Sequence, residues 1–248
     1  MVHVLCASNT RGHGVHSPYL YRFTNNVLYE SHQFYFFKRI EKRRSELLQS
    51  HEIIDKLDFG SGKSKQLTVG AIARKSLCTK RKGRILARII CQFKCQKILE
   101  LGTSFGISTS YLSAPCIESQ CITLEGCPST ARIANQTFET LSLTQVKLIE
   151  GNIDHTLAVA LSELKYVDFV FIDANHTCEA TLKYFETLTS ALDKNAIVVI
   201  DDIYWSPHML QAWQAIQQHP MVTSTIDLFQ LGIVFFNPVL NKKHYKMI

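Results

Sequence analysis

A glycine loop beside an acidic residue is the part of the sequence with the clearest chemistry. The apolar run Ile98–Leu101 contains Glu100 and is followed by Gly102, Gly106 and small residues as far as Thr109. A strand that turns into a helix through glycines lets the backbone approach a bound nucleotide-like ligand closely. An acid near the strand end can hold a polar or cationic group of that ligand. The pattern therefore predicts a ligand-binding loop, with an ordinary strand–loop–helix turn as the alternative.

The spacing of the glycines excludes a dinucleotide-binding fingerprint. That fingerprint, G-x-G-x-x-G, would place glycines where the chain has Ser104 and Ile107. A second apolar run ends in Glu125, at the place where an acid accepts hydrogen bonds from ribose hydroxyls. Because enzymes that bind NAD share this acid, Glu125 alone does not identify the ligand.

The pattern present is E-x-G-x-x-x-G-x-S, from Glu100 to Ser108. It resembles the first motif of class I S-adenosylmethionine (SAM) methyltransferases, in the variant found in small-molecule O-methyltransferases. The resemblance implies that the loop passes under the methionine part of SAM, and that Asn152 to Asp154 lie beside the adenine. Asp154 can equally be a helix N-cap. The residues expected to bind the cofactor are Glu100, Gly102, Ser104, Gly106, Ser108, Glu125, Asn152 and Asp154.

Three further acids follow two later apolar runs. Asp173 comes after Val170–Ile172, and Asp201 and Asp202 come after Val198–Ile200. The carboxyl ends of neighbouring parallel strands face one crevice, so we expect these acids to converge beside the glycine loop. A divalent cation such as Mg²⁺ would relieve their repulsion and lower the pKa of a bound hydroxyl group. The alternative is that Asp173 and Asp202 only cap helices.

The acids resemble the metal site of O-methyltransferases of the catechol, caffeoyl-CoA and antibiotic-sugar types. Asp173 matches the acid after their fourth strand, and Asp201 with Asp202 matches the pair after the fifth. Some relatives have a candidate general base two residues after the first acid, where this chain has Asn175. His176 is the next candidate, because an unperturbed histidine has a pKa of about 6.5, and a structural role is its alternative. The resemblance implies O-methylation, and we expect Asp173 and His176 to be the catalytic residues.

Composition is that of an ordinary globular protein. Of 248 residues, 46% are hydrophobic and 19% are charged. No apolar run approaches the roughly 20 residues of a membrane span, and the N-terminus lacks the pattern of a signal peptide. The eight cysteines form no C-x-x-C pair, which favours reduced thiols. We therefore expect a cytoplasmic protein.

Positive charge is concentrated in residues 1–96, which hold 18 Lys and Arg against 6 Asp and Glu. Such asymmetry is found in nucleic-acid-binding proteins and also on solvated helical faces. Methylation of a base nitrogen usually needs two prolines after the fourth strand, where this chain has Asp173-Ala174-Asn175-His176. The expected partner is a small hydroxylated molecule and not a membrane. RNA or DNA, a homodimer, and a non-catalytic protein that keeps the SAM fold stay open.

Alternating short apolar runs and helical patterns predict an α/β fold from residue 97 onward. Strands are expected near 97–101, 121–125, 146–150, 167–173 and 195–201, with helices near 107–115, 128–142, 154–164, 177–192 and 205–218. The short link between Val222–Phe229 and Leu231–Asn237 predicts an antiparallel hairpin. A parallel sheet that ends in such a hairpin is the order of the Rossmann-like SAM methyltransferase fold.

Residues 1–96 are expected to form a helical extension to a SAM-binding domain of residues 97–248. The helical patterns cover Tyr19–Tyr29, Gln33–Ser50 and Gly83–Phe93. Asp58–Ser64 ends in Gly-Lys-Ser like a P-loop, but Leu57 stands where the P-loop needs a glycine. We expect a polar loop near the site entrance there.

Two segments are candidates for contact with the methyl acceptor. Tyr204, Trp205 and His208 follow the acid pair and are expected to line a pocket. His13, His16 and Tyr19 are expected to fold over the site as a lid.

Overall fold

The computed structural model describes residues 17–58 and 63–247. It contains two compact units, one of Met1–Glu30 with Lys165–Ile248 and one of Ser31–Leu164. His13 and His16 lie outside the described residues. The division into a helical extension and a SAM-binding domain after residue 96 stays a prediction.

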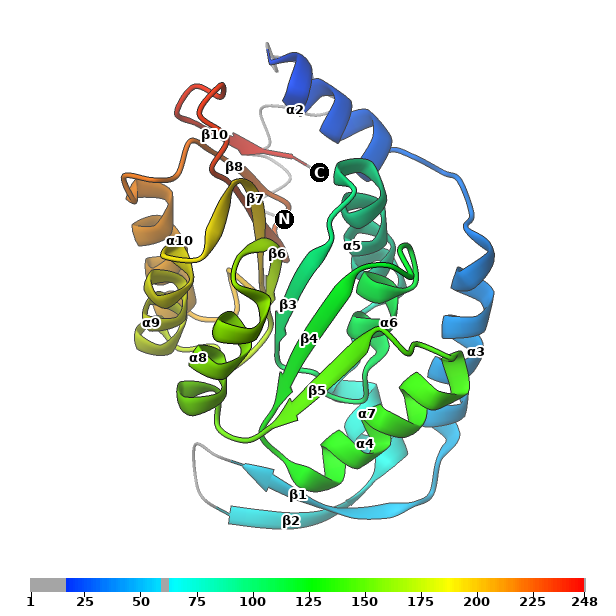
Figure 1. The fold of residues 1–248 in the computed structure, drawn as a ribbon. Coiled ribbons are helices and arrows are strands. Elements are labelled where there is room, and N and C mark those ends of the chain that lie inside the picture. The colour runs from blue at the N-terminus through cyan, green and yellow to red at the C-terminus, as the bar shows by residue number, and fades with distance from the viewer. Residues whose placement is uncertain (1–16, 59–62, 248) are drawn as a thin grey trace. The chain divides into compact units, whose positions relative to one another are not determined.

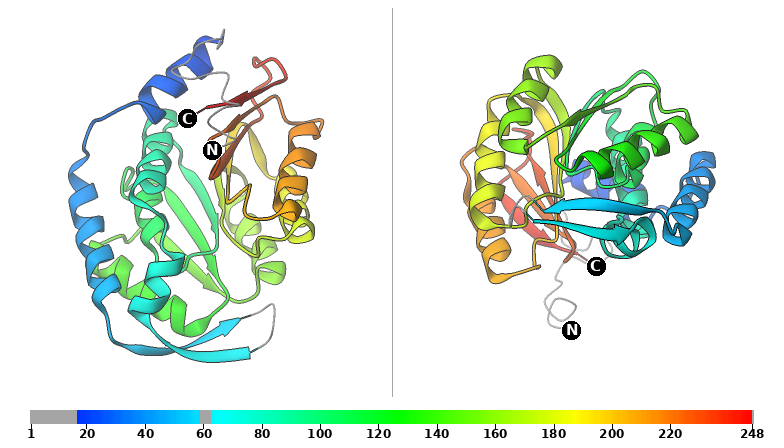
Figure 2. Two further views of the ribbon diagram at one scale, coloured as in Figure 1. Left: turned by 180° about the vertical axis from the view of Figure 1, so that it is seen from behind. Right: turned by 90° about the horizontal axis from the view of Figure 1, so that it is seen from below.

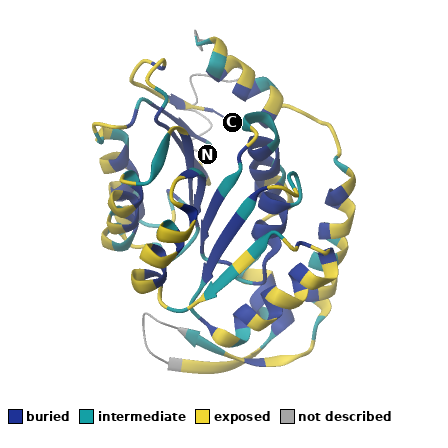
Figure 3. Ribbon diagram, in the orientation of Figure 1, coloured by how far each residue is buried: buried dark blue, intermediate teal, exposed yellow. Residues whose placement is uncertain are grey.

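Three parallel strands form the centre of the unit Ser31–Leu164. They are β3 (Lys97–Leu101), β4 (Gln120–Glu125) and β5 (Val146–Glu150), in the order β3-β4-β5. Their helices are α6 (Ile107–Ser113), α7 (Pro128–Leu141) and α8 (Ile153–Leu164). β3 and β4 are buried almost throughout, whereas β5 is partly exposed (Figure 3). The apolar runs of β3 and β4 thus form the buried strands expected of a covered parallel sheet.

The first part of the same unit combines helices with a β-hairpin. The helices are α3 (Tyr35–Gln49), α4 (Val69–Ser76) and α5 (Lys80–Phe93), and the hairpin pairs β1 (Ile53–Asp58) with β2 (Lys63–Thr68). This hairpin was not predicted from the sequence, because Asp58–Ser64 was expected to be a loop. A strand at Lys63 and Ser64 also removes the P-loop alternative, because a P-loop opens a helix there. The hairpin packs against α7 (Figures 1 and 2).

The other unit begins with α2 (Pro18–Phe23), which continues as the π-helical turn η2 (Thr24–Leu28). The ring of Phe23 packs edge-on against Phe235, with centroids 5.3 Å apart. This places the N-terminal helix against the sheet of its own unit.

The sheet of that unit confirms the predicted terminal hairpin. β6 (Val167–Ile172) and β7 (Leu192–Asp201) are parallel, and β9 (Leu231–Phe235) runs antiparallel both to β7 and to β8 (Ser224–Asp227). An edge strand that the sequence analysis missed, β10 (Lys243–Lys246), pairs parallel with β8. The two helices of this part are α9 (Cys178–Thr189) and α10 (Pro207–Gln218).

The α/β class and the mostly parallel arrangement are therefore confirmed, with N-terminal helices as expected. In the part of the chain that the structure describes, none of the helices has the length and apolar character needed to cross a membrane.

Candidate functional site

The glycine loop between β3 and α6 has an unusual backbone conformation. Gly102, Ser104 and Gly106 have φ angles of 96°, 49° and 78°, all in the left-handed region. The N–H of Gly102 donates to the carbonyl of Leu124 at 3.0 Å, which ties the loop to β4. Ser104 adopts a conformation unusual for a side-chain-bearing residue while its N–H donates to Oε2 of Glu125 at 2.9 Å. The loop is thus held in place by hydrogen bonds to Leu124 and Glu125 of β4.

Gly106 is required by packing as well as by its φ angle. A Cβ at this position would lie 2.5 Å from Cε1 of Phe138 on α7. We expect Gly106→Ala to lower the free energy of unfolding by about 2–4 kcal/mol, from left-handed strain and overpacking together. Chemical denaturation measures this loss.

Phe138→Leu supplies the control for this variant. In the double variant G106A/F138L, the smaller leucine should relieve the overpacking, so part of the lost free energy of unfolding should be recovered. The part that comes from left-handed backbone strain should remain. If G106A is as stable as the wild type, the described packing of the loop on α7 is wrong.

Glu125 lies at the end of β4 with its carboxylate at the loop. Its Oε2 accepts the N–H of Ser104, and its Oε1 accepts the N–H of Cys127 at 2.9 Å. Burial raises the pKa of Glu125, while these N–H donors and the charge of Lys56 oppose the rise. The side chain is only partly exposed, and each carboxylate oxygen keeps a second lone pair for a hydroxyl donor. The group therefore fits the predicted role as acceptor for ribose hydroxyls.

Glu100 is fully buried and bonds within the protein. Its Oε2 accepts the hydroxyl of Thr123 at 2.7 Å and also the hydroxyl of Thr109. Burial raises the pKa of Glu100 to about 7, although the hydroxyl of Ser108 is among the donors that oppose this. Thus Glu100 joins β3, β4 and α6 beneath the loop, a role that the sequence analysis did not foresee. Direct contact with the cofactor stays a prediction.

The raised pKa of Glu100 predicts how the free energy of unfolding changes with pH. Because the pKa of Glu100 rises from 4.5 to about 7 on folding, its neutral form stabilises the folded state at low pH. This contribution is complete below pH 4.5 and is lost as the pH rises to about 7. We expect wild type to lose about 3 kcal/mol across this window relative to Glu100→Gln, which cannot titrate.

Denaturation at a series of pH values measures the difference. Glu150→Gln on the exposed end of β5 is the matched control and should show the wild-type pH dependence. Equal slopes for E100Q and wild type would contradict the buried, protonated state of Glu100.

The residues after β5 lie on the surface. Asn152 is exposed, and its Oδ1 accepts the N–H of Asp154 at 2.9 Å, so Asn152 caps α8. Asp154 is an exposed acid in the first turn of the helix. The proposed N-cap role therefore belongs to Asn152 and not to Asp154. Contact of either side chain with adenine stays a prediction.

The turn after β6 holds two of the predicted residues, Asp173 and His176, with Asn175 between them. Nε2 of His176 lies 3.5 Å from Oδ1 of Asp173, so the structure brings these two together. Asn175 and His176 have φ angles of 61° and 34°. The side-chain amide of Asn175 donates to the hydroxyl of Tyr184 on α9. Consecutive residues in the left-handed region are strained, and such strain clusters at functional sites.

The turn after β7 holds the other two acids. Asp201 is buried, and its Oδ1 accepts the N–H of Asp202 at 2.8 Å. Asp202 has a φ angle of 52°, and its N–H also donates to the carbonyl of Gln230 at 2.8 Å. The carbonyl of Asp202 accepts the N–H of Trp205, so neither acid acts as the N-cap of α10, whose cap is Ser206. The alternative in which Asp202 caps the following helix is therefore wrong.

The carboxylate oxygens of these turns are ligands that suit a hard cation, but the described residues do not surround a metal position on all sides. Across residues 17–58 and 63–247, no three His, Cys, Asp or Glu side chains form a group that could hold a metal ion. Mg²⁺ commonly binds one or two carboxylates and fills its other positions with water and substrate oxygens. The pair Asp201–Asp202, with Asp173, thus remains a candidate for such an open site.

Aromatic side chains border the acid turns. Trp205 is 71% exposed, and its ring centroid lies 6.5 Å from that of His176. Tyr204 stacks on the half-exposed ring of Phe229 and donates its hydroxyl to Oδ2 of Asp227 at 2.6 Å. Exposed rings beside carboxylates are consistent with a binding surface for an organic acceptor.

Many basic side chains in residues 31–164 bond within the protein. Such contacts are Arg39 to the carbonyl of Leu141, Arg43 to Thr137, Arg88 to the carbonyl of His32, and Arg132 to Glu52. These arginines therefore serve the fold of this unit.

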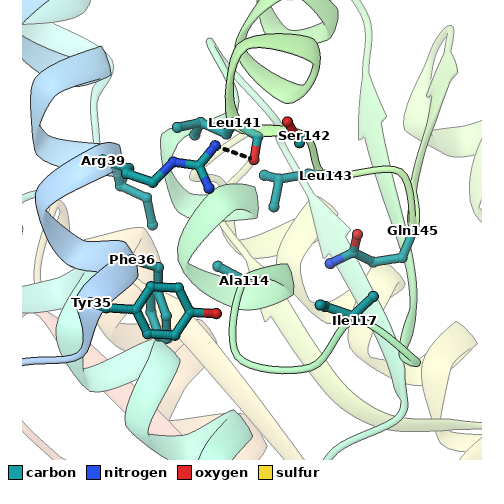
Figure 4. A pocket seen from close by; sticks show the side chains of 10 residues that line it. Tyr35, Phe36, Arg39, Ala114, Ile117, Leu141, Ser142, Leu143 and Gln145 are labelled. Atoms are coloured by element: carbon teal, nitrogen blue, oxygen red, sulfur yellow. Dashed lines mark hydrogen bonds between the residues drawn. The ribbon is translucent and has the colours of Figure 1, made fainter.

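A cavity of about 110 Å³ opens elsewhere in the unit Ser31–Leu164 (Figure 4). It is lined by Tyr35, Phe36, Arg39, Ile40, Ala114, Ile117, Leu141, Ser142, Leu143 and Gln145. A guanidinium N–H of Arg39 donates to the carbonyl of Leu141 at 3.1 Å and closes the end of α7. None of the residues predicted to bind a cofactor or metal lines this cavity.

Comparison with known proteins agrees with this geometry. Residues 99–203 match a sequence family described as a methyltransferase domain. No curated protein matches the chain.

Solved structures with the same fold are distant in sequence. An O-methyltransferase from Bacillus cereus in complex with SAH has 18% identity and a TM-score of 0.58, over 86% of this chain and 96% of that one. The O-methyltransferase TomG from Streptomyces achromogenes, involved in tomaymycin synthesis and in complex with SAM, has 16% identity and a TM-score of 0.59, over 87% and 94%. The methyltransferase PaMTH1 from Podospora anserina, bound to SAH, has 15% identity and a TM-score of 0.57, over 84% and 99%. At these identities the likeness establishes the fold.

Proposed function

We propose that the chain transfers the methyl group of SAM to a hydroxyl oxygen of a small molecule, because residues 99–203 match a family described as a methyltransferase domain. The observation that carries the proposal is the carboxylate of Glu125, which holds the glycine loop at Ser104. The O-methyltransferases among the solved structures of the same fold support the choice of oxygen as acceptor.

The cofactor residues divide by role. We assign the ribose hydroxyls to Glu125, the methionine part to the loop Gly102–Gly106 and the adenine side to Asn152 and Asp154. Glu100 and Ser108 then support the loop from the buried side. SAM supplies a methyl group on a cationic sulfur, which an oxygen nucleophile attacks in line.

The acceptor residues are those of the two acid turns. His176 is oriented by Asp173 and is proposed to take the proton of the attacking hydroxyl. Asp173, Asp201 and Asp202 are the proposed ligands of a divalent cation, Mg²⁺ by preference, that would lower the pKa of this hydroxyl when bound.

Methyl transfer tests the proposal. Purified protein is incubated with SAM carrying a labelled methyl group and with a panel of catechols, other phenols and sugars, with and without Mg²⁺. Label in an O-methyl ether supports the proposal. Label in RNA alone, or SAM binding without transfer to any hydroxylated acceptor, would replace it with the nucleic-acid or non-catalytic alternative.

A further inference from the structure

The cavity at the C-terminal end of α7 combines an apolar floor with one cation (Figure 4). Its floor is made of the buried apolar side chains Phe36, Ile40, Leu141 and Leu143. Tyr35 and Ile117 also line the cavity and are 76% and 74% exposed, so the cavity is open to solvent. An open, mainly apolar cavity with a few polar groups is the usual form of a small-molecule site.

Arg39 brings a positive charge to this cavity without an acidic partner. Its guanidinium donates to one backbone carbonyl at 3.1 Å, and it forms no ion pair within the part of the chain that the structure describes. The other two arginines of α3 differ, because Arg43 pairs with Glu46 and Arg44 pairs with Glu41. A guanidinium has five N–H donors, so a single bond to a carbonyl leaves donors for a ligand. The cavity therefore suits an anion.

The size of the cavity limits the apolar part of a ligand to one ring or a short chain. The volume is about 110 Å³, and an enclosed apolar cavity of about 150 Å³ in another protein takes up benzene. The rings of Tyr35 and Phe36 lie nearly perpendicular, at 83°, with centroids 5.5 Å apart. Because aromatic rings prefer edge-to-face and offset contacts with one another, these two rings favour an aromatic ligand.

The cavity lies at the opposite end of α7 from the glycine loop. α7 begins at Pro128, soon after Glu125, and ends at Leu141, which lines the cavity. A helix of this length, 14 residues, spans about 21 Å. In the same way α6 begins after Gly106 of the loop, and Ala114 at its end lines the cavity. A ligand in the cavity is therefore separate from the proposed cofactor site.

We propose that this cavity is a second ligand site, which binds a small aromatic carboxylate with its ring on the apolar floor and its carboxylate on Arg39. Two parallel N–H bonds from a guanidinium match a carboxylate in geometry as well as in charge. The inference is independent of the proposed function, since none of the candidate cofactor, acceptor or metal residues lines the cavity.

Benzoate is the probe for this site. Calorimetry measures its affinity for the wild-type protein, and benzamide and acetate serve as probes that lack the charge and the ring. Arg39→Met removes the charge. Ala114→Leu adds side-chain volume at the cavity, at a position whose helical φ of −60° accepts leucine. Arg74→Met is the matched control, because Arg74 also donates to a backbone carbonyl, that of Leu48 at 2.9 Å, and does not line the cavity.

We expect benzoate to bind wild type and R74M with a dissociation constant of about 1 mM or lower. R39M and A114L should each weaken this binding about tenfold or more, and benzamide and acetate should bind wild type about tenfold more weakly than benzoate. An excess of S-adenosylhomocysteine (SAH) should not displace benzoate. Circular dichroism should show that each variant is folded.

Methyl NMR of the wild-type protein gives a second readout that does not depend on a variant. Benzoate should shift the signals of Leu143 and Ile117, which line the cavity, and leave that of Leu101 at the end of β3 unchanged. The inference is overturned if benzoate does not bind at millimolar concentration, or if R39M binds it as wild type does. It is overturned equally if a folded A114L binds benzoate as wild type does, if SAH displaces benzoate, or if the signals of Leu143 and Ile117 do not move.

Discussion

Glu125→Gln is expected to lower the affinity for SAH about 100-fold. The variant loses the charge that strengthens hydrogen bonds from ribose hydroxyls. In the wild type, the two carboxylate oxygens of Glu125 accept hydrogen bonds from the backbone N–H groups of Ser104 and Cys127. In the variant, an amide NH₂ replaces one of these oxygens, so that a donor faces a donor. Two weakened charge-assisted hydrogen bonds at about 1.5 kcal/mol each give this loss. Isothermal titration calorimetry measures it directly.

Glu150→Gln is the matched control for this experiment. Glu150 is the residue beside Glu125 on β5, in register, and it is exposed. It should leave the affinity for SAH unchanged. If E125Q binds SAH as tightly as E150Q does, Glu125 is not the ribose acceptor, and the cofactor assignment must be abandoned.

Asp201→Ala is expected to reduce turnover about 1000-fold or more while SAH affinity stays within a few-fold. The loss follows from the several kcal/mol that a bound cation or charge contributes to activation of the acceptor. The cofactor affinity should persist because the proposed cofactor residues all belong to the unit Ser31–Leu164. EDTA should produce the same loss in wild type, and added Mg²⁺ should restore the activity.

Asp201→Asn separates charge from turn geometry. Asparagine keeps an oxygen that can accept the N–H of Asp202, so the turn after β7 should survive. Asp193→Asn is the control on the same strand, because Asp193 accepts the N–H of Asn195 at 2.8 Å in the same way. An active D201N, or full activity of wild type in EDTA, would contradict the proposed metal role.

The strands near the cofactor loop could be predicted because each is a short, mainly apolar run with an acid at its last or next-to-last position. β3, β4 and β5 begin and end within one residue of the predicted limits. The terminal hairpin was predictable for a different reason, since its link is too short for a parallel crossover.

The β1–β2 hairpin was not predicted because its sequence shows no clear alternation of apolar and polar residues. Its strands mix charged and polar residues with few apolar ones, and most of their side chains are exposed. What stabilises the hairpin is contact with α7, which is distant in sequence and leaves no local signal.

The candidate site was predicted by residue type more than by role. The acid at the end of the second apolar run predicted Glu125 as the ribose acceptor, and the structure places its carboxylate against the N–H of Ser104 in the glycine loop, while the ribose contact stays a prediction. For Glu100 the pattern could not distinguish a residue that contacts the cofactor from a buried residue that supports the loop. The difference depends on the hydrogen bonds from Thr109 and Thr123, which lie on other elements of the fold. The convergence of the acid turns beside the glycine loop stays a prediction.

Calorimetry of the wild-type protein with SAM, SAH and NAD tests the central claim most directly. We expect SAM and SAH to bind with one site per chain and NAD to give no heat of binding. Binding of NAD, with no detectable binding of SAM or SAH at millimolar concentration, would contradict the claim that this chain is a SAM-dependent methyltransferase.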